Sequence, residues 1–234
     1  MDNPSDEAQA VRERYARRAE VDWRYSRLNP ATLAAAHERE RAITRLFARL
    51  GWNDLSSRRV LEVGCGTGGN LLELLQMGFA PRNLAGIELL PGRFAQAMQR
   101  LPAAVVLMQG DASLVKLPEN SEDIVLQSTV FSSLLDAPFQ WRLAQTMWRW
   151  VRPGGGVLWY DFTIDNPRNP DVRGVTVARI RELFPVGRVQ FQRVTLAPPL
   201  ARRVCALHPS LYPVFNAIPL LRTHLLAWIE KPLT

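Results

Sequence analysis

Short apolar runs alternate with segments of helical periodicity along most of the chain. The runs occupy residues 60–63, 84–88, 105–109, 123–127 and 157–161, and helix-like segments begin near Asn70, Pro91 and Phe139. Short strands separated by helices form right-handed crossovers and a parallel sheet that is buried on both faces. The pattern therefore predicts a doubly wound α/β fold with helices on both faces of the sheet.

The two ends of the chain depart from this alternation. Charged and aromatic residues alternate in residues 1–28, which predicts a mobile arm or a short helix. Asn29 followed by Pro30 predicts the start of a helix that stops at Gly51. Near the C-terminus, residues 173–184 have helical periodicity, whereas 189–197 and 223–231 predict two more strands. The sheet is then mostly parallel and seven-stranded.

An apolar, proline-rich insertion, residues 198–222, precedes the last strand. Its prolines and its short length argue against a segment that spans a membrane. We interpret it as a cap over a pocket, with docking at a membrane interface as the less favoured alternative.

The composition supports one packed domain, because 47% of the 234 residues are hydrophobic and 22% are charged. We expect residues 1–57 to form an N-terminal helical arm or lid, 58–163 a cofactor-binding core and 164–234 a substrate-side part. Two distant cysteines, Cys65 and Cys205, argue against a disulfide scaffold and a zinc ribbon, so no metal site is expected. The acidic start of the chain shows no secretory signal, and we expect a cytoplasmic protein.

Positive charge is concentrated in the last third of the chain. The net charge is +7, and residues 165–234 contain ten basic and four acidic side chains. This part should attract anions, although a solvated arginine-rich face explains the same count. No aromatic and basic RNA-recognition motif is present, and no nucleic-acid partner is expected.

The most informative segment is residues 58–75, RRVLEVGCGTGGNLLELL. A strand ends at Val63, glycines follow, and a helix begins, so a cofactor can approach bare backbone. The glycine spacing alone also fits a dinucleotide fingerprint. Glu62, however, would repel a pyrophosphate and favours a cationic group.

The run from Glu62 to Gly68 resembles the first motif of the class I S-adenosylmethionine-dependent methyltransferases, here of the type that acts on small molecules. The resemblance covers about residues 58–163 and includes the segment Arg152 to Gly155, which is expected to turn into the fifth strand. It implies S-adenosyl-L-methionine as the cofactor and a Rossmann-like methyltransferase fold. It also implies that Glu88 accepts hydrogen bonds from the ribose hydroxyls and that Asp111 accepts one from the adenine amino group. The backbone N–H of Ala112 is expected to donate to the adenine ring. The cofactor-binding residues expected from the resemblance are Glu62, Gly64, Cys65, Gly66, Gly68, Glu88, Leu89, Asp111, Ala112 and Gln127.

Candidates for catalysis are less well defined. Asp161 ends the fifth predicted strand, where a general base is expected, and His208 lies in the insertion; His37 is a weaker candidate. Tyr15 and Tyr25 are candidates to close over the cofactor. Polar residues after the fifth strand are candidates for the acceptor pocket: Asn166, Asn169 and Arg173.

These observations favour methyl transfer by in-line displacement to a small-molecule acceptor, with a hydroxyl as the reacting group. Residues 127–130 are QSTV rather than an Asn/Asp-Pro-Pro-Tyr run, which argues against methylation of nucleobase or glutamine amino groups. The insertion and the arginine-rich last third favour an amphipathic or anionic acceptor. An NAD-linked oxidoreductase and a non-catalytic S-adenosylmethionine-binding protein are the alternatives, and the oligomeric state stays open.

Overall fold

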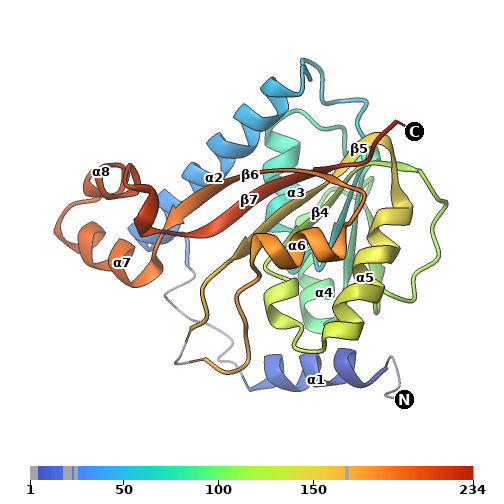
Figure 1. Cartoon of the computed structure of the whole chain (residues 1–234), viewed down its shortest axis with the longest axis horizontal. Helices are drawn as coiled ribbons and strands as arrows, with labels where there is room; N and C mark the ends of the chain where they lie inside the picture. The colour runs from blue at the N-terminus through green and yellow to red at the C-terminus, as the bar shows by residue number, and fades with distance from the viewer. Residues whose placement is uncertain (1–4, 18–22, 24–25, 167–168, 234) are drawn as a thin grey trace.

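The computed structural model of the chain describes residues 5–17, 23, 26–166 and 169–233. A single seven-stranded sheet forms its centre, with the strand order β3-β2-β1-β4-β5-β7-β6 (Figure 1). All neighbouring strands pair in parallel except β7, which is antiparallel to both β5 and β6. The strands are β1 Val60–Val63, β2 Leu84–Glu88, β3 Val106–Gln109, β4 Glu122–Ser128, β5 Val151–Phe162, β6 Arg188–Leu196 and β7 Arg222–Glu230. The predicted α/β fold with a mostly parallel sheet is confirmed.

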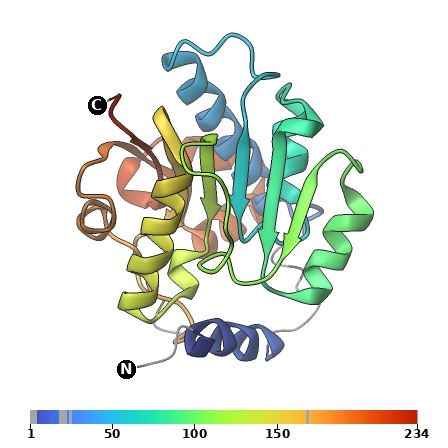
Figure 2. The same ribbon diagram turned by 90° about the vertical axis from the view of Figure 1, so that its right-hand side faces the viewer.

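Helices cover both faces of this sheet and bury two apolar cores. One core lies between the sheet and α5 and α6, and the other lies between the sheet and α2, α3 and α4. The helix α1 crosses the edge where the parallel strands end (Figure 2). The helices are α1 Ser5–Ala16, α2 Pro30–Arg49, α3 Gly69–Gln76, α4 Pro91–Arg100, α5 Ala137–Trp150 and α6 Val177–Leu183.

Polar side chains define where three of the helices begin. The Asn29 side chain accepts a hydrogen bond from the Ala31 N–H (3.0 Å) at the start of α2. Asp136 caps α5 in the same manner, and Thr176 caps α6. Each cap satisfies an amide that the helix itself leaves without a partner, so these starts follow from the local sequence. The helix predicted from Asn29 is therefore present as expected.

The segment expected to turn at residues 152–155 is part of β5 instead. The pairing of β5 with β4 shifts register there, because Glu122 pairs with Val151 and Ile124 pairs with Gly156. Gly154 has a φ of +76° within this irregularity, which is a conformation that favours glycine. The glycines therefore form a bulge at the start of a strand rather than a separate turn.

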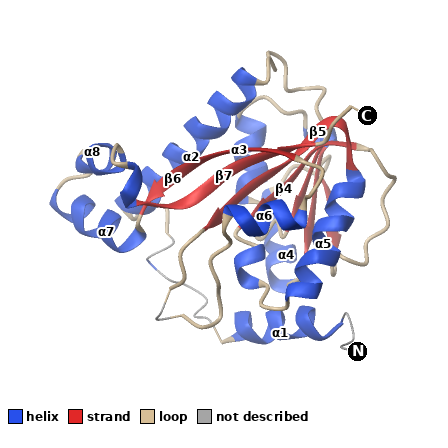
Figure 3. Ribbon diagram, in the orientation of Figure 1, coloured by secondary structure: helices blue, strands red, loops and turns tan. Residues whose placement is uncertain are grey.

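The insertion between β6 and β7 folds into two helices, α7 Pro198–Leu207 and α8 Leu211–Asn216, and a 3-10 turn, Pro219–Leu221 (Figure 3). Its buried side packs against the start of α2, where Ala31 joins Ala201, Val204, Cys205 and Tyr212 in a third small core. No residue from 198 to 222 lines either of the two cavities described below. The insertion is a projecting helical pair, and its expected role as a cap over a pocket stays a prediction.

Candidate functional site

The glycine loop after β1 has a backbone that only glycine adopts easily. Gly64 has a φ of +67°, and its N–H and that of Cys65 both donate to the Ile87 carbonyl (2.8 and 3.0 Å). A Cβ atom added at Gly64 would lie 2.6 Å from Val130 Cγ2. Gly68, at φ +80°, precedes α3. The loop is thereby held close to the neighbouring strand and to the loop after β4.

Glu88, at the end of β2, is buried and lines a cavity beside this loop. Its Oε2 accepts from the Gly66 N–H (2.7 Å), and its Oε1 accepts from the Leu90 N–H (2.8 Å). A carboxylate oxygen has capacity for a second donor, so both oxygens remain able to accept from a ligand. The backbone therefore holds an acceptor pair at the rim of the cavity.

Asp111 follows β3 and lines the same cavity. Its Oδ1 accepts from the Ser113 N–H at 2.8 Å. Its Oδ2 is buried and has no hydrogen-bond partner. A buried carboxylate oxygen without a donor is costly, and a ligand donor would remove that cost.

The cavity itself has a volume of about 130 Å³ and extends along the ends of β1, β2 and β4. Leu89 and Ala112 lie in its wall together with Val130, and Ser128 and Thr129 bring polar groups from the loop after β4. The cavity thus combines apolar walls with a few fixed polar groups, which is the usual composition of a small-molecule site.

The helix α1 forms one wall of this cavity through Ala8, Val11 and Tyr15. The Arg93 guanidinium lies 4.5 Å from the centre of the Tyr15 ring. Further along α1, Glu7 pairs with Arg14 (2.6 Å) and accepts from the Leu135 N–H (2.7 Å). The expectation that Tyr15 closes over the site agrees with this position, whereas Tyr25 lies outside the described residues.

Glu62 points to the other face of the sheet and lines neither cavity. It is fully buried, its Oε1 accepts from Asn70 Nδ2 (2.5 Å), and its Oε2 has no partner. Burial raises the pKa of this carboxyl to about 8, although Asn70 and the positive charge of Arg39 oppose the shift. Burial thus favours the protonated form of Glu62, and contact of this carboxyl with a cationic part of a ligand stays a prediction.

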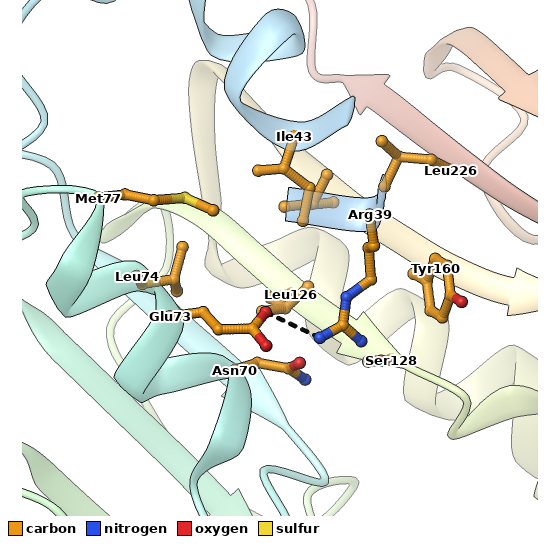
Figure 4. Close-up of a pocket in the computed structure, with 11 residues that line it drawn as sticks. Arg39, Ile43, Asn70, Glu73, Leu74, Met77, Leu126, Ser128, Tyr160 and Leu226 are labelled. Atoms are coloured by element: carbon orange, nitrogen blue, oxygen red, sulfur yellow. Dashed lines mark hydrogen bonds and ion pairs between the residues drawn. The ribbon is translucent and has the colours of Figure 1, made fainter. Parts of the chain in front are cut away.

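A second, smaller cavity of about 20 Å³ lies between α2 and α3 (Figure 4), and Asn70, the hydrogen-bond partner of Glu62, lines it. Arg39 reaches into it from α2 and pairs with Glu73 of α3 (2.8 Å), and Arg27 also pairs with Glu73. The Arg39 guanidinium lies 5.1 Å from the centre of the Tyr160 ring. Ser128 lines both this cavity and the larger one, so the two are neighbours at the end of β4.

Gln127 and Asp161, two of the residues expected in the site, support the loop after β4 instead. Gln127 Oε1 accepts from the Val130 N–H (3.1 Å), and Asp161 Oδ2 accepts from the Ser132 N–H (3.1 Å). Both side chains are fully buried and line neither cavity. Burial raises the pKa of Asp161 to about 7. This arrangement does not favour direct contact of Gln127 or Asp161 with a ligand.

Cys65, Gly66 and Gly68 shape the loop without lining a cavity. The Cys65 side chain is buried, and its Sγ lies where a Cβ atom on Gly86 would approach to 2.8 Å. Burial raises the pKa of the Cys65 thiol, so it stays protonated. This agrees with the interpretation of Cys65 as a small residue that fills the turn.

The structure does not bring His208 to either cavity. His208 follows α7 in the projecting insertion and is exposed, and His37 is exposed on α2. The polar residues after β5 that were expected in the acceptor pocket also line neither cavity: Asn166, Asn169 and Arg173.

His224 of β7, which the sequence did not single out, lies next to the second cavity. It pairs with Phe162 at the end of β5, and its ring stacks on Tyr160 with 5.1 Å between ring centres. Nδ1 is 3.1 Å from Thr223 Oγ1, and Nε2 has no hydrogen bond to any described residue. Burial and the charge of Arg39 lower the pKa of His224 to about 4, so the ring is neutral at pH 7.

The comparisons with known proteins find methyltransferases. Residues 60–155 match the family described as a methyltransferase domain. The chain is 30% identical over 151 residues to a phthiotriol/phenolphthiotriol dimycocerosates methyltransferase of Mycobacterium leprae, covering 62% of this chain and 54% of that protein. It is 36% identical over 110 residues to a fatty-acid O-methyltransferase of Mycolicibacterium smegmatis, covering 46% and 38%.

A solved structure has the same fold over nearly the whole chain. It is a 1,6-didemethyltoxoflavin-N1-methyltransferase of Burkholderia thailandensis, with a TM-score of 0.64, 19% identity and coverage of 99% of this chain and 92% of that one. These matches support a methyltransferase domain of the class I S-adenosylmethionine-dependent type, and the family model itself covers residues 60–155. The matched parts span about half or less of these two curated relatives.

Proposed function

We propose that this protein binds S-adenosyl-L-methionine in the larger cavity and transfers its methyl group to an oxygen atom of a small acceptor. The observation that carries the proposal is the pair of carboxylates at the strand ends, Glu88 and Asp111. Glu88 offers two acceptor oxygens to the ribose hydroxyls, and the unpartnered Oδ2 of Asp111 offers one to the adenine amino group. The walls from Leu89 and Ala112 would contact the adenine ring.

The charge distribution favours this cofactor over a dinucleotide. Two carboxylates line the cavity, and Arg93, the arginine among its described lining residues, is placed over the Tyr15 ring. A pyrophosphate would therefore meet acidic groups near the glycine loop, which favours a nucleoside without phosphates. The amino acid end of the cofactor would lie at Gly64, next to Ser128 and the second cavity.

When bound, the cofactor would supply a sulfonium-bound methyl group, whose carbon bonds to an acceptor atom held in line while S-adenosylhomocysteine leaves as a neutral thioether. The chain therefore has to hold the acceptor in line and exclude water. The end of β4, where Ser128 lines both cavities, is the place where an acceptor can approach from the side of Tyr160 and His224.

His224 lines neither cavity itself, but its ring stacks on Tyr160 of the second cavity, and we propose it as the group that receives the proton of a hydroxyl acceptor. This role requires the neutral tautomer in which Nδ1–H donates to Thr223 Oγ1, so that the lone pair of Nε2, which has no hydrogen bond to a described residue, can accept the proton. A hydroxyl becomes strongly acidic as its oxygen gains the methyl group, so a weak base is sufficient to take the proton. The new O–CH3 bond then replaces the S–CH3 bond, and the proton stays on Nε2.

The surroundings of this end of the sheet favour an apolar or amphipathic acceptor. Phe162, Leu226 and Leu158 lie on the same side of the sheet as Tyr160, and Arg39 is the cation nearest to them in the second cavity. The names of two relatives, which refer to phthiotriol dimycocerosates and to a fatty acid, are compatible with such an acceptor.

A set of acceptors with one chain length tests the proposal. The protein is incubated with S-adenosylmethionine and a long-chain alcohol, the matching carboxylic acid or the matching amine, and products are identified by mass spectrometry. We expect a methyl group on the alcohol or the acid and none on the amine. Methylation of the amine alone would refute transfer to oxygen, and cofactor binding without any product would favour the non-catalytic alternative.

The variant His224→Asn separates the role of the base from that of the fold. Methylation of the alcohol should fall by about a hundredfold, because its proton loses an acceptor. Methylation of the carboxylic acid, which is already ionised at neutral pH, should change little. An equal loss for both acceptors would show that His224 does not act as a base.

A further inference from the structure

The projecting insertion of α7, α8 and the following 3-10 turn has an exposed apolar surface. We call this surface the α7–α8 tip, and its large apolar members are Leu207, Val214, Ile218 and Leu220, which are 80%, 62%, 48% and 87% exposed. α7 packs on α8, and α8 packs on the 3-10 turn, so these side chains belong to one compact unit (Figure 1). Exposed apolar side chains gathered in this way mark an interaction surface.

The tip is not an unfinished part of the core. Ala201, Val204 and Tyr212, on the buried side of the insertion, already pack against the start of α2. Arg222 fixes the insertion from below, because its Nε donates to the Asn216 carbonyl (2.7 Å) and one of its other nitrogens donates to the Arg193 carbonyl (3.0 Å). The apolar residues of the tip are therefore held outward by a folded base.

The charge around the tip has one sign. Residues 183–229 contain five arginines and no aspartate or glutamate, although the whole chain has 22 acidic residues. Arg202 and Arg203 lie on α7 itself, and Arg193 and Arg222 lie at its base. Glu38 of α2 contacts this segment, but its carboxylate accepts hydrogen bonds from Thr195 (2.9 and 3.3 Å).

Apolar side chains with a rim of arginines match the surface of an anionic bilayer. Leucine and isoleucine side chains enter the boundary between headgroups and acyl chains, while arginines remain at the level of the phosphates. The described helices include none that is long and apolar enough to span a bilayer, so contact would be at the surface. The apolar crest offers few partners to a nucleic acid, which binds mainly through its phosphates.

We propose that the α7–α8 tip docks this protein onto the surface of an anionic phospholipid bilayer. The apolar crest enters the interface, and Arg202 and Arg203 contact the lipid phosphates. This proposal rests on the shape and charge of the insertion and is independent of the acceptor and of the methyl transfer.

Sedimentation with vesicles tests the proposal, using phosphatidylcholine alone and phosphatidylcholine mixed with phosphatidylglycerol. We expect the protein to sediment with the mixed vesicles and not with phosphatidylcholine alone, and we expect salt to weaken binding. The double variant Leu207→Ser with Leu220→Ser should lose at least about tenfold in affinity. The double variant Arg202→Gln with Arg203→Gln should lose roughly twentyfold at low salt.

Matched controls carry the same changes elsewhere on the surface. Val186→Ser with Leu114→Ser changes two side chains that are 65% and 64% exposed away from the tip, and Arg45→Gln with Arg49→Gln removes two exposed charges from α2. Neither should weaken vesicle binding. Absence of binding to mixed vesicles, or equal losses in tip and control variants, would overturn the proposal. A third result would also overturn it: a wild-type protein that is a dimer in solution and does not bind vesicles, and that becomes a monomer in the tip variants. The tip would then be a dimer interface.

Discussion

The buried carboxyl of Glu62 should make the stability of the protein depend strongly on pH. Burial raises its pKa to about 8 from an ordinary value of 4.5, and the side chain is fully buried in the folded state. Below about pH 4.5 the folded and unfolded states both carry the proton, so the stabilising contribution is fully present. As the pH rises toward 8, the unfolded state ionises first, and this contribution is lost.

The size of the effect follows from the displacement of the pKa. One pKa unit corresponds to about 1.4 kcal/mol, so ionisation of Glu62 should lower the free energy of unfolding by up to about 5 kcal/mol between pH 4.5 and 8. The variant Glu62→Gln keeps a polar side chain next to Asn70 and has no proton to lose. Its stability relative to the wild type should therefore increase steadily over this range.

Urea unfolding followed by tryptophan fluorescence measures this difference at a series of pH values. Asp161 titrates in both proteins, so its contribution cancels in the comparison. The control Glu119→Gln makes the same substitution at an exposed carboxyl. A difference between Glu62→Gln and the wild type that stays constant within about 1 kcal/mol would refute the reasoning, because Glu62 would then ionise as it does in water.

Four further outcomes follow from the site. The wild-type protein should bind S-adenosylhomocysteine more tightly than its inosine analogue by about 1–3 kcal/mol, and Asp111→Ala should abolish this preference. Calorimetric titration with both ligands measures the difference. Glu88→Gln should weaken binding of both ligands equally, by about 1–3 kcal/mol, in the same calorimetric titration. Between pH 5 and 8, the protein should release more protons when it binds S-adenosylmethionine than when it binds S-adenosylhomocysteine, because the positive charge of the former lowers the pKa of Glu62. Calorimetry in buffers of different ionisation enthalpy measures the number of protons released. Gly68→Ala should destabilise the fold by about 1–3 kcal/mol in urea unfolding, because its φ is +80° and its Cβ would lie 2.7 Å from Leu101 Cδ1.

The sequence was informative where local patterns decide the structure. The strands are short apolar runs, and the helix starts at Asn29 and Asp136 follow from capping side chains. The positions of Glu88 and Asp111 in a common cavity also follow, because the carboxyl ends of neighbouring parallel strands meet at one edge.

The orientation of individual side chains was harder to predict. In β1 every residue is buried, and in β4 all but the last are, so no alternation of polar and apolar positions shows which face a residue takes. Glu62 and Gln127 were therefore expected to face the cofactor, whereas the structure places both away from the larger cavity.

Two features depend on contacts between distant segments. His224 reaches the end of β5 only because β7 pairs with β5 in antiparallel register, which the local sequence does not encode. The prolines of the insertion argued against a segment that spans a membrane, and no helix was predicted there, yet Pro198 and Pro199 occupy the first positions of α7, where proline is compatible with a helix.

The central claim is that the cavity lined by Glu88 and Asp111 holds a phosphate-free adenosine cofactor, and calorimetric titration of the purified protein with S-adenosylhomocysteine and with NAD tests it most directly. We expect saturable binding of S-adenosylhomocysteine with a dissociation constant of about micromolar order and no binding of NAD. Binding of NAD with no response to S-adenosylhomocysteine would contradict it.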